Sequence, residues 1–384
     1  MVKRRFWLER VESAWRRRSV VWLRGVRRAG KTSLAQTLDR VEYFDCELPR
    51  VRRGMEDPEA LLAGLRRRRV VLDEIHRLPN PSELLKIAAD HFPDVKVLAT
   101  GSSTLGASAR FRDTLAGRKV EVWLTPMIEP DLDDFGDTDL PHRLLHGGLP
   151  PYFLSPDLPE RDYQEWMDAY WAKDIQELFR LERRASFQRF VELLFAQSGG
   201  LFEATRFAAP CEVSRTTITN YLAVLEATGV MLVLRPFSSR RSHEIVAAPK
   251  VYGFDTGFVC AHRGWTELRR EDLGRLWEHY VLNEIVARTQ GTEVRYWRDK
   301  QGHEVDFVWL PRRGSLLALE CKWSAKDFDP AGLLAFARNY PRATLLVVAT
   351  DATPSFKRSY DTQTVEFLGL SEAVVRLVDG AKGG

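Results

Sequence analysis

A glycine-rich segment near the N-terminus carries residues that could bind phosphate. Gly25 and Gly30 lie five positions apart, and Lys31, Thr32 and Ser33 follow directly. This G-x4-G-K-T spacing lets backbone N–H groups surround phosphate oxygens, while Lys31 reaches the β- and γ-phosphates and the Thr32 hydroxyl ligates Mg²⁺. A glycine turn before a helix can be purely structural. The complete motif between a strand and a helix, however, predicts a P-loop that binds ATP with Mg²⁺. We count Ser33 among the residues that bind the nucleotide.

Two carboxylates follow the next apolar run. Residues 69–74 read Arg-Val-Val-Leu-Asp-Glu, a buried strand with acids at its carboxyl end. Acids there can simply form a turn or a helix cap, but beside a P-loop we expect Asp73 to complete the Mg²⁺ shell and Glu74 to polarise the attacking water. A third strand, residues 95–100, ends near Ser102, which could sense the γ-phosphate or belong to a plain Gly-Ser turn.

An arginine could stabilise the charge that develops during phosphoryl transfer. Arg110, Arg112 and Arg118 are the candidates, acting within the chain or on a neighbouring subunit, and Arg118 after Gly117 is the first choice. The competing interpretation for each of them is an uninvolved surface residue.

The last third contains a second set of charged residues on neighbouring predicted strands. Alternation along residues 303–310 puts Val305, Phe307 and Trp309 on one face and Glu304, Asp306 and Val308 on the other, and on the following strand Glu320 and Lys322 share a face. A hairpin can therefore gather Asp306, Glu320 and Lys322. A charged solvent face is the competing explanation.

This acid, spacer and E-x-K arrangement resembles the PD-(D/E)XK nuclease superfamily, as does the order helix–strand–strand–strand–helix–strand from residue 273. The resemblance implies Mg²⁺ or Mn²⁺ held by Asp306 and Glu320, with Lys322 helping to activate a bound water. It also implies that Glu278, on the preceding helix, completes the metal site. The fold can equally serve only to bind DNA.

The middle of the chain predicts a winged helix-turn-helix. A helix over residues 201–209, an N-cap at Ser214, a second helix to about Ala227 and a strand over residues 230–234 follow that order. In the DNA-binding interpretation the exposed helix start and the wing meet the duplex, through Ser214, Arg215, Thr216, Thr217, Asn220, Arg240 and Arg241. The alternative is a packing or lid module.

Composition limits the remaining classes. The 384 residues carry a formal net charge of +4, and their 57 basic residues are 45 Arg and 12 Lys, which fits either genomic bias or phosphate recognition. Four scattered Cys argue against disulfides and zinc, and the chain has no membrane-length apolar run or signal peptide. We expect a cytoplasmic protein with no membrane partner.

The segments VVWLRGVRRAGKTSL, VVLDEIHRLP, VLATGSST, HGGLPPYFL and YWAKDI together resemble AAA+-related, STAND-like P-loop ATPases of archaea and bacteria. His76 stands where such proteins often have Gln, with no obvious catalytic consequence. The expected fold is α/β in three parts: a P-loop ATPase domain over 1–135, a helical and winged-helix region over 136–235 and a nuclease-like domain over 236–384.

The resemblance implies an ATPase that binds branched or structured DNA, remodels it and possibly cleaves it, and that can form a homo-oligomer. The alternative is a nucleotide-dependent switch in signalling or defence that recruits protein partners and carries a degenerate nuclease fold. A metabolic kinase is disfavoured, because nothing after the P-loop resembles an acceptor site for a small molecule.

Overall fold

The computed structural model describes residues 1–101, 109–158, 160–176, 183–238, 248–291, 294–309 and 316–382. Spatial contacts divide the chain into two units. Unit 1 comprises Met1–Leu140, Gly148–Gln188 and Asn220–Val230, and unit 2 comprises Pro141–Gly147, Arg189–Thr219 and Met231–Gly384. Helices α13 (Arg184–Ala196) and α15 (Arg215–Ala227) each contain residues of both units.

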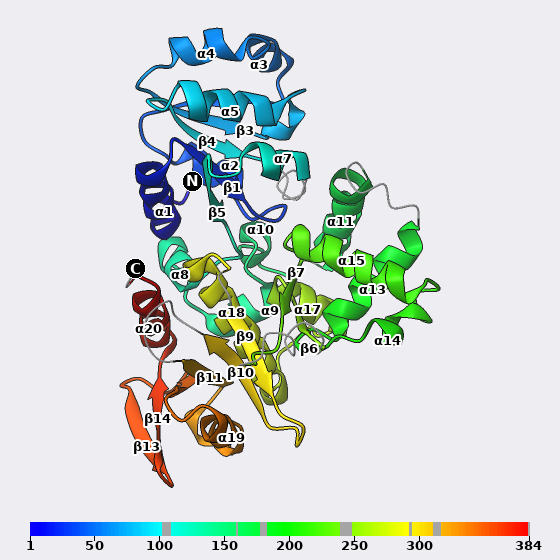
Figure 1. Ribbon diagram of the computed structural model, residues 1–384. Helices are drawn as coiled ribbons and strands as arrows, with labels where there is room; N and C mark the ends of the chain where they lie inside the picture. The colour runs from blue at the N-terminus through cyan, green and yellow to red at the C-terminus, as the bar shows by residue number, and fades with distance from the viewer. Residues whose placement is uncertain are drawn as a thin grey trace. The chain divides into compact units, whose positions relative to one another are not determined.

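A five-stranded parallel sheet forms the centre of unit 1 (Figure 1). Its order is β2-β3-β4-β1-β5, and the strands are β1 (Val20–Arg24), β2 (Val41–Asp45), β3 (Arg69–Asp73), β4 (Lys96–Thr100) and β5 (Lys119–Trp123). The strands predicted over 69–74 and 95–100 are therefore confirmed within one residue at each end, and β1 is the strand expected before the P-loop. β1 lies between β4 and β5, so the loop after β1 leaves from the interior of the sheet.

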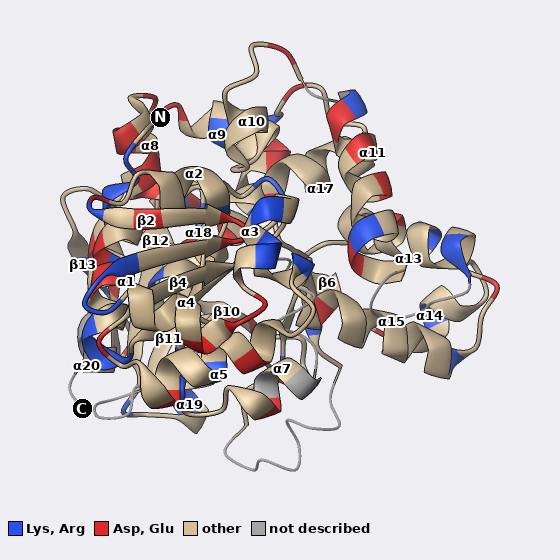
Figure 2. Cartoon of the chain, turned by 90° about the horizontal axis from the view of Figure 1, so that it is seen from above, with Lys and Arg blue, Asp and Glu red and all other residues tan. Residues whose placement is uncertain are grey.

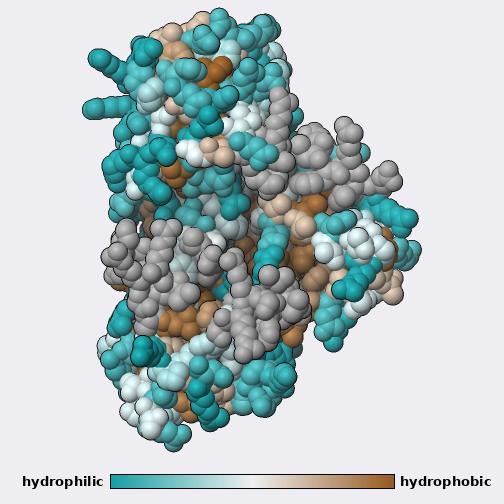
Figure 3. Space-filling model, viewed as in Figure 1, coloured by the Kyte–Doolittle hydropathy of each residue, from teal (hydrophilic) through white to brown (hydrophobic). Residues whose placement is uncertain are grey.

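Short helices surround this sheet, and they present few apolar side chains to solvent. They are α1 (Arg5–Arg17), α2 (Lys31–Gln36), α3 (Pro49–Gly54), α4 (Pro58–Gly64), η1 (Ile75–Arg77), α5 (Pro81–His91), α7 (Ala109–Thr114) and α8 (Glu129–Phe135). Helix α4 buries only Leu62, and the surface over α3 and α4, at the top of Figure 3, is mainly hydrophilic. The apolar strands and α5 supply the core, where Trp22, Leu72 and Leu85 are almost fully buried.

A second part of unit 1 is helical. It contains α10 (Pro150–Phe153), α11 (Glu160–Ala169) and η2 (Tyr170–Ile175), where the last is a π-helix that continues α11. Helix α11 buries Tyr163, Trp166 and Met167, and most of its charged residues are acidic (Figure 2). The aromatic residues of η2, Tyr170 and Trp171, are buried as well.

Unit 2 is built on a six-stranded mixed sheet of order β13-β14-β12-β11-β10-β9. Its strands are β9 (Val294–Arg298), β10 (Glu304–Trp309), β11 (Leu317–Lys322), β12 (Thr344–Ala349), β13 (Phe356–Tyr360) and β14 (Gln363–Leu368). Helix α18 (Arg270–Thr289) precedes β9, and α19 (Ala331–Asn339) lies between β11 and β12, so the predicted order from residue 273 is present. β13, β14 and α20 (Leu370–Lys382) extend it.

The remainder of unit 2 is a three-stranded sheet with flanking helices. The sheet has the order β6-β8-β7, formed by β6 (Gly200–Leu201), β8 (Lys250–Gly253) and β7 (Met231–Leu234), and the helices are α9 (Leu140–His146), α14 (Ala204–Ala208) and α17 (Thr256–Arg263). The helix expected over 201–209 is thus shorter than predicted, because residues 200 and 201 pair with β8 instead. Helix α15 begins after Ser214, whose Oγ accepts from the Thr217 N–H at 3.1 Å, which is the predicted N-cap.

None of the helices in the described ranges combines the length and the apolar character that a membrane span requires.

Candidate functional site

The loop between β1 and α2 has the shape of a P-loop because glycine occupies its two tightest positions. A Cβ at Gly25 would lie 2.5 Å from the carbonyl oxygen of Leu124, so only glycine permits this approach of the loop to the chain after β5. Gly30 has a φ of +93°, a conformation that side chains disfavour, and it directly precedes α2. The N-terminus of α2 therefore opens at Lys31, where backbone N–H groups can face an anion.

Lys31 is buried and folded back onto its own loop. Its Nζ donates to the carbonyl oxygens of Gly25 at 2.9 Å and Val26 at 3.1 Å. Burial lowers the pKa of Lys31, and the negative charges of Glu74 and Asp174 partly offset that effect. An incoming phosphate would offer this ammonium group a charged partner in place of two carbonyls.

Asp73 lies at the carboxyl end of β3, as the sequence predicts, and its carboxylate is buried. It accepts hydrogen bonds from the hydroxyl of Thr100, at the end of the adjacent β4, and from the hydroxyl of Tyr43 on β2 at 2.5 Å. Burial and the hydrogen bond to Asp73 raise the pKa of Tyr43. The carboxylate is thus held by two hydroxyl groups, and the sequence did not point to either of them.

Glu74 follows in the left-handed conformation, with a φ of +53°. Its backbone N–H donates to the Thr100 hydroxyl at 3.1 Å, which fixes the turn out of β3. Its carboxylate lies 3.0 Å from Nδ1 of His76. Burial raises the pKa of Glu74, but His76 and Lys31 outweigh that effect and lower it.

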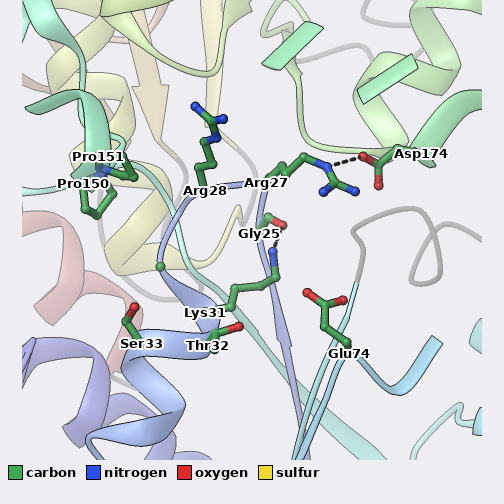
Figure 4. Close-up of a pocket in the computed structure, with 11 residues that line it drawn as sticks. Gly25, Arg27, Arg28, Lys31, Thr32, Ser33, Glu74, Pro150, Pro151 and Asp174 are labelled. Atoms are coloured by element: carbon green, nitrogen blue, oxygen red, sulfur yellow. Dashed lines mark hydrogen bonds and ion pairs between the residues drawn. The ribbon is translucent and has the colours of Figure 1, made fainter. Parts of the chain in front are cut away.

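The P-loop and Glu74 border one cavity of about 280 Å³ (Figure 4). It is lined by Gly25, Arg27, Arg28, Gly30, Lys31, Thr32, Ser33, Glu74, Pro150, Pro151 and Asp174. The P-loop residues predicted from the motif therefore meet Glu74 at one site. Asp73 is not part of the lining.

Asp174 and the proline pair were missed by the sequence analysis. Asp174 belongs to η2 and lies far from the P-loop in the sequence, within a stretch that is rich in aromatic residues. Its carboxylate accepts from Nε of Arg27 at 3.1 Å. No sequence pattern links this buried acid to its partner in the P-loop.

Side chains from other parts of unit 1 also contact the P-loop. The Trp166 indole N–H donates to the carbonyl oxygen of Arg27 at 3.0 Å, and Arg28 donates to the Tyr152 hydroxyl at 3.0 Å. Arg4, which pairs with buried Asp131 at 2.7 Å, donates to the carbonyl oxygen of Ala29 at 2.9 Å. Three consecutive P-loop residues are thus held by side chains from outside the motif.

Arg118 lies away from this cavity. Its Nε donates to both carboxylate oxygens of Asp90 on α5, at 2.8 Å and 3.0 Å, and its side chain is about one-third exposed. Ser102 lies outside the described residues, and so do the side chains of Arg110 and Arg112.

The acids predicted for the second site lie close together in unit 2, but a lysine lies among them. Nζ of Lys250, on β8, contacts Glu304, lies 3.4 Å from Glu278 and lies 4.0 Å from Asp306. Burial lowers the pKa of Lys250, and the surrounding carboxylates outweigh this and raise it overall. Glu278 also accepts from the Tyr252 hydroxyl at 2.5 Å.

Glu320 and Lys322 join this cluster from β11. Lys322 donates to Glu320 at 2.9 Å, and Asp306 accepts from the backbone N–H of Cys321 at 2.8 Å. Burial, followed by the charges of Glu278 and Glu320, raises the pKa of Asp306, and burial raises that of Glu320 as well. Among the described residues, no group of three or more His, Cys, Asp or Glu side chains is arranged to hold a metal ion.

The prediction that side chains alternate strictly between the two faces of β10 is wrong. Val305 and Val308 both pack into the core beneath α19, and the pairing with β9 shifts register between these two residues. The irregularity moves Val308 to the face of Val305, whereas the prediction had placed it beside Asp306.

Most of the residues predicted to contact DNA lie at the start of α15. Ser214, Arg215, Thr216 and Asn220 are exposed, and Thr217 is half-buried. Arg240 and Arg241 lie outside the described residues.

The parallel sheet and the P-loop cavity give the N-terminal part of unit 1 a fold that resembles a P-loop ATPase domain. Residues 17–129 match the family model of the AAA domain. Residues 137–269 and 273–368 match two domains of unknown function, DUF8612 and DUF4143.

Among curated proteins, the chain is similar to the uncharacterized protein Rv2008c of Mycobacterium tuberculosis, with 29% identity over 318 residues that cover 80% of this chain and 71% of that protein. Among solved structures it is similar to the Walker-type ATPase PABY2304 of Pyrococcus abyssi, at 16% identity and a TM-score of 0.41, over 68% of this chain and 96% of that one. A STAND protein, PH0952 of Pyrococcus horikoshii, matches at 13% identity and a TM-score of 0.30, over 76% and 48%. These low scores carry no argument about activity, and the assignment of unit 1 rests on the P-loop and the AAA match.

Proposed function

We propose that the protein is an ATP phosphohydrolase whose nucleotide site is the P-loop cavity of unit 1. The observation that carries this proposal is the meeting of Lys31, Thr32 and Glu74 around one cavity at the N-terminus of α2. Lys31 would exchange its two carbonyl partners for the β- and γ-phosphates, and Glu74, whose lowered pKa keeps it ionised, would accept a hydrogen bond from the attacking water.

The residues present suit a magnesium ion. The Thr32 hydroxyl and the Asp73 carboxylate are the oxygen ligands that Mg²⁺ prefers, and Asp73 already accepts from two hydroxyl donors that water molecules of the ion could replace. When bound, the ion would neutralise charge on the phosphates.

The test is nucleotide binding and turnover in the full chain. Wild type should bind ATP with Mg²⁺ and release phosphate; Lys31→Ala should lose binding, and Glu74→Gln should bind ATP but turn it over at least about 100-fold more slowly. Asp168→Asn is a matched control, because Asp168 pairs with Arg184 and does not line the cavity. Unchanged turnover in Glu74→Gln would contradict the role of Glu74.

Arg118 remains our candidate for an arginine that acts on a neighbouring subunit, in a homo-oligomer. It would have to leave Asp90 to do so. Turnover per chain that rises with protein concentration in wild type and not in Arg118→Ala would support this role, and equal turnover at all concentrations would contradict it.

We further propose that the ATPase acts on branched or structured DNA through a winged-helix region and a nuclease-like domain, in the three parts 1–135, 136–235 and 236–384. The exposed polar start of α15 supports this proposal, and so does the proximity of Glu278, Asp306 and Glu320. Arg215→Ala should weaken duplex or four-way DNA binding and reduce the slope of log affinity against log salt by about 1. DNA affinity that does not depend on salt would contradict it.

One observation favours the second candidate, a nucleotide-dependent switch that recruits protein partners and carries a degenerate nuclease fold. Lys250 already supplies a positive charge to the acids that a catalytic metal would need. Cleavage of branched or linear DNA with Mg²⁺ or Mn²⁺, lost in Asp306→Ala, would support the nuclease; no cleavage by wild type would support the switch.

A further inference from the structure

The guanidinium group of Arg27 is held at one end. Its Nε donates to Oδ2 of Asp174 at 3.1 Å, and the Arg27 side chain is 32% exposed whereas that of Asp174 is 6% exposed. Among the described residues, Asp174 is the only acid within ion-pair distance of Arg27. The terminal Nη1 and Nη2 of Arg27 make no hydrogen bond to any other described residue. Figure 4 shows them directed into the cavity that Lys31 and Glu74 also line.

This geometry suits a phosphate. The guanidinium fork binds two oxygens of one phosphate when its donors are aligned, and an arginine held at Nε loses less freedom on binding than a free one. Arg27 lies in the loop between Gly25 and Gly30, so its free donors and the Lys31 ammonium group border the same space.

The backbone of Arg27 is held by the same helical segment as its side chain. Trp166, which is almost fully buried, donates to its carbonyl oxygen, and Asp174 follows two turns later in the π-helix. A π-helical turn is unfavourable in isolation and is found often at functional sites, where it re-aims a side chain. This segment lies outside the residues that match the AAA domain and inside those that match DUF8612.

We propose that Arg27 contacts the terminal phosphate of a bound nucleoside triphosphate and that Asp174 is the positioning residue that aims it. The segment of unknown function thereby contributes to the nucleotide site. This inference rests on the proposed ATP binding at the P-loop. It assigns to Arg27 and Asp174 a contribution to the preference for triphosphate over diphosphate.

The experiment measures the affinity of the full chain for a fluorescent non-hydrolysable ATP analogue and for fluorescent ADP, both with Mg²⁺. Arg27→Ala should weaken binding of the triphosphate about 10- to 50-fold and that of ADP less than about 3-fold, because one charge-assisted contact to the terminal phosphate is lost. Asp174→Asn, which keeps the shape of the side chain, should act in the same direction by about 3- to 10-fold.

The double variant separates positioning from general structure. If Asp174 acts through Arg27, Arg27→Ala with Asp174→Asn should bind the triphosphate no more weakly than Arg27→Ala alone. Asp168→Asn, in α11, should bind both nucleotides like wild type. Multiplying effects in the double variant, or equal losses for ATP analogue and ADP in Asp174→Asn, would overturn the inference.

Each failure can be assigned. A wild-type chain that binds neither nucleotide overturns the proposed function and this inference with it. A wild-type chain that binds both, together with an Arg27→Ala variant that still prefers the triphosphate as wild type does, overturns only the inference. Arg27→Ala alone decides this outcome if Asp174→Asn does not fold.

Discussion

The imidazole Nδ1 of His76 lies 3.0 Å from the carboxylate Oε2 of Glu74, the residue that we propose polarises the attacking water. Both belong to the tight turn after β3, where Glu74 has a positive φ and η1 begins at Ile75. From the sequence alone, no catalytic consequence is expected of His76. The turn geometry brings the two side chains together, and His76 contributes to the lowered pKa of Glu74.

His76→Ala should therefore lower the turnover number for ATP. Without its neighbour, the Glu74 carboxylate gains rotamers that do not face the water, and we expect a loss of about 3- to 10-fold in kcat with KM for ATP nearly unchanged. His76→Gln, which keeps a side-chain donor at this position, should retain most of the activity. Steady-state kinetics of the two variants check this, and a large rise in KM with unchanged kcat would contradict it.

Tyr43→Phe should lower the magnesium concentration that ATP turnover requires. The Tyr43 hydroxyl donates to Asp73 at 2.5 Å and would compete with the ion for the same carboxylate. Removing it should lower the Mg²⁺ concentration for half-maximal turnover by about 3- to 10-fold. A magnesium titration of ATP turnover measures the effect, with Asp73→Asn as the control that should lose turnover at every magnesium concentration.

Lys250→Met should destabilise unit 2 and should make its stability rise more steeply as pH falls. The substitution leaves Glu278, Glu304 and Asp306 without the cation that they share. Removing one partner of a buried ion pair lowers the free energy of unfolding by about 3–5 kcal/mol. Asp306 already has a raised pKa, so the folded state binds protons that the unfolded state releases, and stability should rise as pH falls from neutral toward the ordinary carboxyl range.

Thermal unfolding of Lys250→Met at pH 7.5 and pH 5.5 checks this expectation. The variant should recover part of its loss at the lower pH, and Mg²⁺ or Mn²⁺ should stabilise it if the acids can bind a metal. Lys322→Met is the comparison, because Lys322 is half-buried and, within the part of the chain that the structure describes, forms an ion pair only with Glu320, at 2.9 Å. An equal loss at both pH values would contradict the proposed charge balance.

Through His279, acid should act in the opposite direction and weaken unit 2. Its Nδ1 lies 2.9 Å from the carbonyl oxygen of Arg275 and must donate to it, while Nε2 accepts from the hydroxyl of Ser198 at 2.6 Å, so the buried ring is neutral. Burial lowers the pKa of His279 from 6.5 to about 4. The unfolded chain takes up a proton that the folded chain refuses, so stability is complete above about pH 6.5 and is lost as pH falls through about 4.

The expected loss from this residue is about 3 kcal/mol across that range. Urea unfolding of wild type and His279→Gln at pH 7 and pH 4.5 measures it as the difference between the two proteins. The variant should be less stable at pH 7 but should lose less on acidification. Equal losses in both proteins would show that His279 is not the linked group.

Local patterns encoded much of the fold and one half of the nucleotide site. The P-loop, the strands that carry Asp73 and Glu74, and the strand and helix order around Asp306 and Glu320 follow from glycine spacing, apolar runs and turn residues. These signals are local because φ, ψ and side-chain direction repeat over a few residues. They predicted positions well, but they could not anticipate the bulge in β10, which depends on its pairing with β9.

Tertiary structure alone decided which of the 45 arginines and which distant acids matter. Arg66, Arg68 and Arg69, a basic run in the sequence, pair with Asp94, Glu42 and Glu12, whereas Arg27 pairs with Asp174 and keeps its free donors at the cavity. Lys250 reaches the acids of α18 and β10 in the same way. No period or spacing in the chain links such partners, because their proximity arises only when separate elements pack together.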